Sequence, residues 1–284
     1  MDLFHISLAQ WSLHRKIQGG DLAPLDFPAY SRDEFNITAV EYVNGFFPDR
    51  EPDLRFAEEL RLRAADAGVL SLLIMIDRAG DLGDPDSQAR SLAVNKHRQW
   101  AEVAAHLGCH SIRVNAHSKG TPQEQASLVS EGLSHLTEAI APTGLNVLVE
   151  NHGGHSSNAD WLVDVIQRVN QPTCGTLPDF GNFFLNTDMT EWYDRYTGVA
   201  QMMPYAKAVS AKSNDFDGDG NELHTDYEKM IGIVLDAGYN GYIGIEYEGQ
   251  NHSEDEGIKL TQSLLKRVSE HRRQSISPSR RKPS

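Results

Sequence analysis

The stretch of the chain that decides the fold covers residues 121–151 and reads TPQEQASLVSEGLSHLTEAIAPTGLNVLVEN. Its first part predicts a helix, because Thr121 and Glu124 have the spacing of a capping box and apolar residues then recur at helical intervals. Gly144 is typical of the left-handed residue that ends a helix. The last part, NVLVEN, predicts a buried strand, and this strand delivers the acid Glu150 to its carboxyl end.

The same unit of helix, glycine and strand recurs along the chain. Strands are expected near residues 3–9, 37–43, 70–76, 110–115, 146–151, 174–179, 206–212 and 241–246. Apolar strands that alternate with amphipathic helices are typical of a parallel sheet covered by helices. Eight such units in about 270 residues predict an α/β fold, a single-domain (β/α)8 TIM barrel. The alternative is a doubly wound open sheet, but the turn after the first strand, QWSLHRK, lacks the GxGxxG pattern.

The charge of the chain is divided between an acidic body and a short basic tail. Residues 1–270 are expected to form the barrel, and residues 271–284, HRRQSISPSRRKPS, a disordered tail. The net charge of the chain is −14, and since the tail carries five arginine or lysine residues and no acid, the body is near −19. Nucleic-acid binding normally starts from a basic face, so this body argues against a nucleic-acid partner.

The sequence also bears on where the protein works. No run of about 18 apolar residues is present, which argues against a membrane span. The N-terminus lacks a basic start followed by an apolar block, so no secretory signal is expected. Cys109 and Cys174 lie outside any CxxC pattern, as expected of buried thiols in a reducing compartment. These features predict a cytoplasmic location.

Polar residues follow most of the expected strands. In a (β/α)8 barrel the carboxyl ends of the strands meet at one mouth, where the functional site is built. These ends carry, in chain order, Gln10, Trp11, His14, Glu41, Tyr42, Asp77, Arg113, Asn115, His117, Glu150, Asn151, His152, Asp179, Asn182, Ser210, Lys212, Asn214, Asp215, Glu246, Tyr247 and Glu248. We expect them to surround one space.

Three acids occupy matching positions on three of these strands. Glu150, Asp179 and Glu246 would face the same space, where three carboxylates repel one another unless a cation or shared protons compensate them. A divalent ion that prefers oxygen ligands, such as Mn²⁺ or Mg²⁺, would do so directly. The alternative is that each acid pairs separately with a base such as Lys212 or Arg113.

Four motifs carry a resemblance to a known family: LVENHGG at 148–154, TLPDFGN at 176–182, AKAVSAKSNDFDGDGNE at 206–222 and GYIGIEYEG at 241–249. With them the chain resembles the xylose isomerase-like TIM-barrel superfamily, in its sugar phosphate isomerase/epimerase branch. The resemblance implies one divalent metal ion (Mn, Mg, Zn or Co) held by Glu150, Asp179 and Glu246. It also implies that Glu150 and Glu246 act as the acid/base pair, that the partner is a small sugar substrate, and that a homo-oligomer is possible.

The chain departs from the family pattern at two positions. The family usually places a histidine on strand seven, where this chain has Ser210, two residues before Lys212. A second histidine, three residues after the strand-six aspartate, is Asn182 here. A hydroxyl is a weaker ligand than an imidazole for Mn²⁺ or Zn²⁺, so the site either binds its metal less firmly or uses a substitute ligand, for which His152, His224 and a water are the candidates. Alternatively, Lys212 neutralises the carboxylates without a metal.

The resemblance implies a sugar or keto-sugar isomerase or epimerase that removes a proton next to a carbonyl group with metal assistance. Besides the two glutamates, His152 and Lys212 are expected to bind hydroxyls or stabilise a developing oxyanion. The expected substrate-binding residues are Trp11, His14, Arg113, Asn115 and Asn182. Loss of a leaving group would instead give a lyase or hydratase for 3-keto-glycosides, and loss of catalysis a sugar-binding barrel.

Overall fold

Eight parallel strands form the centre of the molecule in the computed structural model, which describes residues 3–276. The strands are β1 (His5–Ala9), β2 (Ala39–Val43), β3 (Leu70–Met75), β4 (Ser111–Val114), β5 (Asn146–Glu150), β6 (Cys174–Leu177), β7 (Val209–Ser213) and β8 (Tyr242–Tyr247). Their order in the sheet is β6-β5-β4-β3-β2-β1-β8-β7, and every ladder is parallel. The predicted (β/α)8 barrel is confirmed, and an open doubly wound sheet, which has a different strand order, is ruled out.

The barrel closes between β6 and β7 through isolated contacts instead of a full ladder. Two parallel bridges join Thr176 to Ala206 and Asp179 to Ser210. The backbone N–H of Ser210 donates to the carbonyl of Pro178 at 2.9 Å, and that of Phe180 donates to the carbonyl of Ser210 at 3.1 Å. This junction places the residues just beyond β6 directly beside the start of β7.

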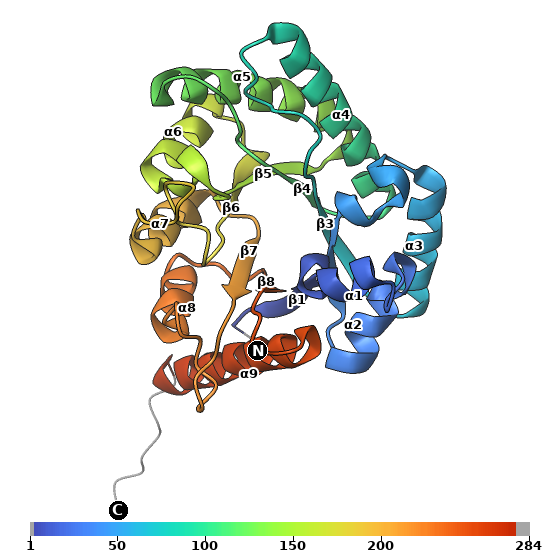
Figure 1. Ribbon diagram of the computed structural model, residues 1–284, viewed down its shortest axis with the longest axis vertical. Coiled ribbons are helices and arrows are strands. Elements are labelled where there is room, and N and C mark those ends of the chain that lie inside the picture. The colour runs from blue at the N-terminus through green and yellow to red at the C-terminus, as the bar shows by residue number, and fades with distance from the viewer. Residues whose placement is uncertain (1–2, 277–284) are drawn as a thin grey trace, which may run out of the picture.

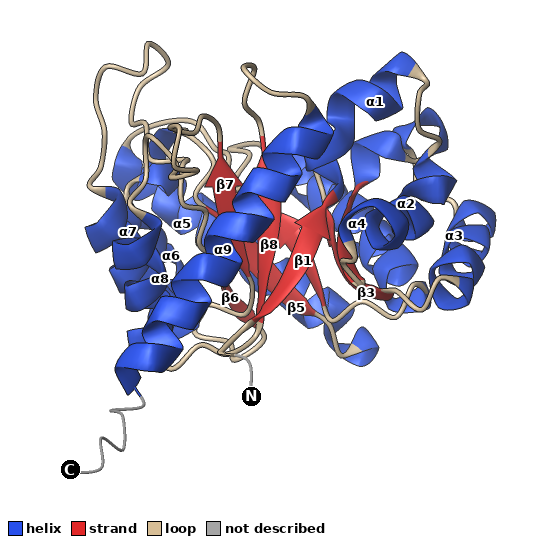
Figure 2. Ribbon diagram, turned by 90° about the horizontal axis from the view of Figure 1, so that it is seen from below, coloured by secondary structure: helices blue, strands red, loops and turns tan. Residues whose placement is uncertain are grey.

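Helices surround the strands on the outside, as Figures 1 and 2 show. In residues 3–276 the α-helices are α1 (His14–Gly19), α2 (Phe27–Phe35), α3 (Leu54–Asp66), α4 (Ser87–His106), α5 (Pro122–Ile140), α6 (Ala159–Val169), α7 (Arg195–Met202), α8 (Tyr227–Asp236) and α9 (Glu254–Ile276). None of these helices is both long and apolar enough to cross a membrane. The ring of helices leaves the two ends of the barrel for loops.

Local sequence signals explain where the elements begin and end. The backbone N–H of Glu124 donates to the hydroxyl of Thr121, and the carboxylate of Glu124 accepts from the backbone N–H of Thr121, so the predicted capping box opens α5. Gly144 has a φ of 74°, a left-handed conformation that favours glycine, and it turns the chain into β5. The helix-to-strand unit expected at residues 121–151 is therefore present.

Alternation along each strand decides which side chains enter the barrel. Val149 belongs to the large apolar cluster that the strands share with the helices, whereas Leu148 belongs to a smaller cluster of the strands inside the barrel. Successive side chains of a strand point to opposite faces, so Glu150 lies on the same inner face as Leu148. The same alternation turns Lys212 of β7 and Glu246 of β8 inward.

The end of the chain differs from the predicted boundary. Helix α9 runs to Ile276, so residues 271–276 of the expected tail continue the helix. The imidazole of His271 lies 2.7 Å from the carboxylate of Glu228, and the guanidinium of Arg272 donates to the carbonyl of Glu228 at 2.7 Å. These contacts with α8 account for the extension. Residues 277–284, the rest of the predicted tail, lie outside the described residues.

Candidate functional site

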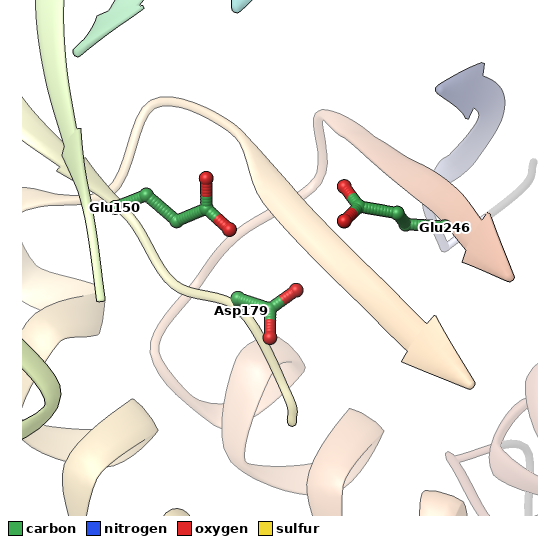
Figure 3. Close-up of side chains that lie close together, drawn as sticks. All are labelled: Glu150, Asp179 and Glu246. Carbon is green, nitrogen blue, oxygen red and sulfur yellow. The ribbon is translucent and has the colours of Figure 1, made fainter. Parts of the chain in front are cut away.

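Three acidic side chains meet at the carboxyl ends of the strands. Glu150 ends β5, Asp179 follows β6 by two residues, and Glu246 is the penultimate residue of β8. Each offers a carboxylate oxygen within 4.8 Å of the other two, and all three side chains are buried. Figure 3 shows their carboxyl groups converging from three directions. We call these three residues the carboxylate cluster.

Asp179 is held by the loop that follows it and by β7. Its Oδ1 accepts hydrogen bonds of 2.8 Å from the backbone N–H groups of Gly181 and Asn182, and its Oδ2 accepts one of 2.7 Å from the hydroxyl of Ser210. Burial raises the pKa of Asp179 to about 7, although the charge of Lys212 acts in the opposite direction. Three hydrogen bonds therefore fix Asp179 in position.

Glu150 lies between a guanidinium group and a side-chain amide. Its Oε2 lies 2.8 Å from Nε of Arg113 in an ion pair, but the N–H is not directed at the oxygen, so neither atom makes a hydrogen bond. Its Oε1 accepts a hydrogen bond of 3.1 Å from the amide of Asn182. Burial raises the pKa of Glu150 to about 7 against the opposing charge of Arg113. Glu150 can therefore carry a proton at neutral pH.

Glu246 lies against the ammonium group of Lys212. Its Oε1 is 3.0 Å from Nζ of Lys212, whereas its buried Oε2 accepts no hydrogen bond. Burial raises the pKa of Glu246, but the charges of Lys212 and Arg113 outweigh burial and hold this pKa below its usual value. The cluster thus combines one ionised carboxylate with two carboxyl groups whose pKa values are raised.

Arg113 and Asn115 both contact a fourth acid, Asp77, which lies just beyond β3. The guanidinium of Arg113 donates to Oδ1 of Asp77 at 2.7 Å, and the amide of Asn115 donates to the same oxygen at 2.9 Å. Burial raises the pKa of Asp77, but the charge of Arg113 outweighs it and holds the pKa well below its usual value. Arg113 therefore joins two acids from neighbouring strands, Asp77 and Glu150.

A cavity of about 680 Å³ opens beside the cluster. Of the predicted site residues, those that line it are Trp11, Arg113, Asn115, His152 and Glu246. Glu150 and Lys212 do not line the cavity but are buried in contact with Arg113 and Glu246, which do. Asn182 is likewise buried and connects Glu150 with Lys212. Most of the predicted site residues therefore lie together, partly exposed to the cavity and partly behind its wall.

Trp11 forms an aromatic wall of this cavity together with Phe46. The two rings stack with their centroids 5.9 Å apart, and Nε1 of Trp11 donates a hydrogen bond to the carboxylate of Glu248. His14, which we expected to bind substrate, does not line the cavity. Its ring stacks on Trp11 at 4.7 Å, and its Nδ1 lies 2.7 Å from the carbonyl oxygen of Trp11 and 3.5 Å from the carboxylate of Glu254. This position supports Trp11 from behind.

The two histidines proposed as replacement metal ligands lie in different surroundings. His152 lines the cavity, and burial lowers its pKa to about 4, with the charges of Arg113 and Lys212 acting in the same direction. His152 is therefore neutral at neutral pH and can accept or donate one hydrogen bond. His224 is exposed and lies 3.3 Å from the carboxylate of Asp215. Neither histidine belongs to the carboxylate cluster.

The sequence of the chain matches one protein family over most of its length. The model of that family, described as xylose isomerase-like TIM barrel, matches residues 33–268. The chain belongs to the xylose isomerase-like TIM barrel family. No curated protein matches the sequence itself.

Solved structures of three other proteins resemble this chain over nearly its whole length. An L-ribulose 3-epimerase shares 14% identity over 99% of this chain and 100% of its own, with a TM-score of 0.74. A xylose isomerase-like TIM barrel protein from Mycobacterium smegmatis, in complex with magnesium, shares 17% over 94% and 97%, with a TM-score of 0.70. A 3-keto-D-glucoside 4-epimerase from E. coli shares 13% over 94% and 100%, with a TM-score of 0.69. Identities this low show a common fold.

The carboxylate cluster of this xylose isomerase-like barrel suits an oxygen-ligated divalent ion. Three carboxylates approach within 4.8 Å, and Oε2 of Glu150 and Oε2 of Glu246 accept no hydrogen bond. Ser210, which stands where the resemblance places a histidine, uses its hydroxyl to donate to Asp179. Because no histidine within residues 3–276 joins the cluster, its donors favour Mg²⁺ or Mn²⁺ over Zn²⁺.

Sequence reasoning did not assign a role to Asn151, which positions the cluster. Its Oδ1 accepts a hydrogen bond of 2.7 Å from the backbone N–H of Asp179, and its amide donates to the carbonyls of Asp179 and Asn182 at 3.0 and 3.1 Å. Asn151 thereby ties the end of β5 to the loop after β6. The signal that could have identified Asn151 is its position directly after Glu150, at the end of an apolar strand.

Glu41 is a buried acid that sequence reasoning likewise left without a role. It lies in the middle of β2, where its Oε1 accepts a hydrogen bond of 2.6 Å from the hydroxyl of Ser7 and its Oε2 accepts none. A Cβ atom on Gly244 would lie 2.5 Å from Oε1, so the glycine makes room for this carboxyl group. Burial raises the pKa of Glu41 to about 7.

Proposed function

We propose that this protein is a sugar or keto-sugar isomerase or epimerase that moves a proton at a carbon next to a carbonyl group. The observation that carries the proposal is the arrangement of Glu150 and Glu246, which reach one cluster from β5 and β8. Their surroundings move the two pKa values in opposite directions. Pairs of acids with pKa values pushed apart are typical of acid–base catalysis.

The ionised partner, Glu246, is the proposed base. Its Oε2 takes the proton from carbon, and the electrons of the broken C–H bond move toward the carbonyl, whose oxygen gains negative charge. Glu150, whose raised pKa lets it hold a proton, is the proposed acid. Its carboxyl group lies behind the cavity wall but within 4.8 Å of Glu246, so it returns a proton to the part of the substrate that enters the cluster. Return to the other face of the same carbon gives an epimer. Return to the former carbonyl carbon, with transfer of the proton from the neighbouring hydroxyl to the former carbonyl oxygen, gives an isomer. Transfer of the proton from Glu246 to Glu150 through solvent restores the starting state.

Positive charge and polar groups beside the cluster support this chemistry. Lys212 provides a positive charge 3.0 Å from Glu246, and neutral His152 faces the cavity, where it can bind a substrate hydroxyl. Glu150, Asp179 and Glu246 would hold a divalent ion, which when bound would polarise the carbonyl and stabilise negative charge on its oxygen. Trp11 and Phe46 offer an apolar wall against a sugar face.

The size of the cavity favours a second candidate, a lyase or hydratase that acts on 3-keto-glycosides. The lining extends from Glu246 to Lys96 and Trp100 of α4. A volume of about 680 Å³ lies within the range of about 300–1,000 Å³ that binds drug-sized ligands, which exceed one sugar ring. In this reaction the same proton abstraction is followed by loss of the group on the neighbouring carbon.

Exchange of substrate hydrogen with solvent tests the proposal whichever product is formed. Ketoses, aldoses and 3-keto-glycosides are incubated with the protein in D₂O, with EDTA or with added Mn²⁺, and followed by NMR. Deuterium at the carbon next to the carbonyl supports proton abstraction, and the product then separates an epimer, an isomer and a released aglycone. A sugar that binds in the cavity but exchanges no hydrogen would contradict the proposal and indicate a non-catalytic sugar-binding barrel.

A further inference from the structure

The ammonium group of Lys212 is held by oxygen atoms from three neighbouring side chains. Its Nζ donates to Oδ1 of Asn182 at 3.2 Å and lies 3.0 Å from Oε1 of Glu246 and 3.4 Å from Oε2 of Glu248. The ammonium thus makes one hydrogen bond, to Asn182, and two ion pairs, with Glu246 and Glu248. The side chain is buried, and the charge of the ammonium is therefore screened little by water.

Gly181 leaves the space that the side chain of Lys212 occupies, because it has no Cβ atom. A Cβ atom on residue 181 would lie 2.9 Å from Cδ and 3.0 Å from Cγ of Lys212. Any larger residue would therefore push the lysine stem out of its place. The loop that carries Gly181 also supplies two backbone N–H groups to Asp179, so one short segment arranges both the carboxylate and the neighbouring cation.

The location of this cation has a consequence for metal binding. The carboxylate oxygens of the cluster lie within 4.8 Å of one another, and Lys212 lies 3.0 Å from one of the three acids. A divalent ion held by the cluster would be close to the ammonium, and like charges at this separation repel strongly where water is excluded. The two cations would also compete for the carboxylate of Glu246.

We propose that Lys212 is the resident cation of the carboxylate cluster and that it opposes the binding of a divalent ion there. The inference rests on the proposed function, because it concerns the same cluster and names what regulates its metal affinity. The chain then binds a divalent ion weakly, and the ion enters against the charge of Lys212 or by moving its ammonium away from Glu246. Removal of this charge should strengthen metal binding.

Titration with Mn²⁺ tests the proposal directly. Protein freed of metal by EDTA dialysis is titrated with MnCl₂ by calorimetry, as the wild type, as Lys212→Met and as Lys96→Met. Lys96 is the matched control, since it lines the same cavity but forms no ion pair with the cluster in the described structure. We expect Lys212→Met to bind Mn²⁺ about tenfold more tightly or better, because a like charge has been removed. Lys96→Met should change the affinity little.

Equal or weaker Mn²⁺ binding by Lys212→Met would overturn the proposal, and an equal gain in Lys96→Met would assign the effect to net charge. If Lys212→Met folds poorly without metal, Gly181→Ala provides the second variant, because it displaces the lysine stem and keeps the charge on the chain. It should also bind Mn²⁺ more tightly than the wild type. If neither variant binds Mn²⁺ more tightly than the wild type, the proposal is overturned. Hydrogen exchange on sugars is a separate measurement. If the proposed activity is not found, the Mn²⁺ affinities still test the role of Lys212, so the two failures can be told apart.

Discussion

The hydroxyl of Ser210 donates a hydrogen bond of 2.7 Å to Oδ2 of Asp179 across the junction where β6 and β7 close the barrel. Both side chains are buried. The residue that stands where the resemblance places a metal-binding histidine therefore acts as a support for one of the acids. Removal of this hydroxyl is the first test of its importance.

Ser210→Ala should destabilise the protein by about 1–3 kcal/mol, because a buried carboxyl oxygen loses its hydrogen-bond donor. Urea unfolding at constant pH measures the change. The matched control is Ser127→Ala on the exposed face of α5, which should alter stability by less than about 0.5 kcal/mol. Equal stability of the Ser210 variant and the wild type would show that the hydroxyl is dispensable.

Glu150→Gln and Glu246→Gln should each lower solvent hydrogen exchange on a responsive sugar by about 100-fold or more, since a positioned acid or base contributes that much. Glu138→Gln makes the same chemical change on an exposed position of α5 and should leave the rate unchanged. Circular dichroism of each variant confirms that the fold persists. Exchange at the wild-type rate in either cluster variant would remove that residue from the mechanism.

Glu41→Gln should stabilise the protein above neutral pH. The pKa of Glu41 rises from 4.5 to about 7 on folding, so the folded state holds this proton more tightly than the unfolded chain. Stability from this group is present below about pH 4.5 and is lost as pH rises toward 7. The advantage of the glutamine variant should therefore grow between these values and reach about 1–3 kcal/mol. Urea unfolding at a series of pH values measures the stability of both proteins. A difference in stability between Glu41→Gln and the wild type that does not change with pH would contradict the prediction.

Mn²⁺ should raise the thermal unfolding temperature of the wild type, because an ion that binds only the folded cluster stabilises it by mass action. At a hundredfold excess over Kd the rise should be about 5 °C. Asp179→Asn removes one of the three carboxylates, so its unfolding temperature should respond much less to Mn²⁺. A rise of the same size in this variant would place the bound ion elsewhere on the protein.

Much of the fold was readable from short patterns. The capping box at Thr121, the left-handed glycine at Gly144 and the apolar strand that follows are local features, and each specifies its own backbone conformation. Repetition of that unit eight times led to the barrel, and the barrel led to Glu150, Asp179 and Glu246 as neighbours. Their matching positions at the carboxyl ends of three strands were sufficient to predict that these acids share one space.

Other parts of the site depended on how distant segments meet. The sequence marks His14 as a residue near a strand end, but contacts with Trp11 and Glu254 hold it away from the cavity. The sequence shows only that Asn151 is polar. In the structure its side chain links the end of β5 to the loop after β6 by hydrogen bonds with the backbone of Asp179. Hydrogen bonds of this kind join residues that are 28 positions apart, and no local pattern specifies them.

By itself, then, the sequence of this protein determined the order of its helices and strands and the convergence of three acids. Only the tertiary structure decided the charge state and partners of those acids. Burial raises the pKa of Glu150 and Asp179, while the ammonium of Lys212, admitted by Gly181, holds Glu246 ionised. The physical reason is that pKa values depend on desolvation and on charges a few ångströms away, which are set by packing between strands.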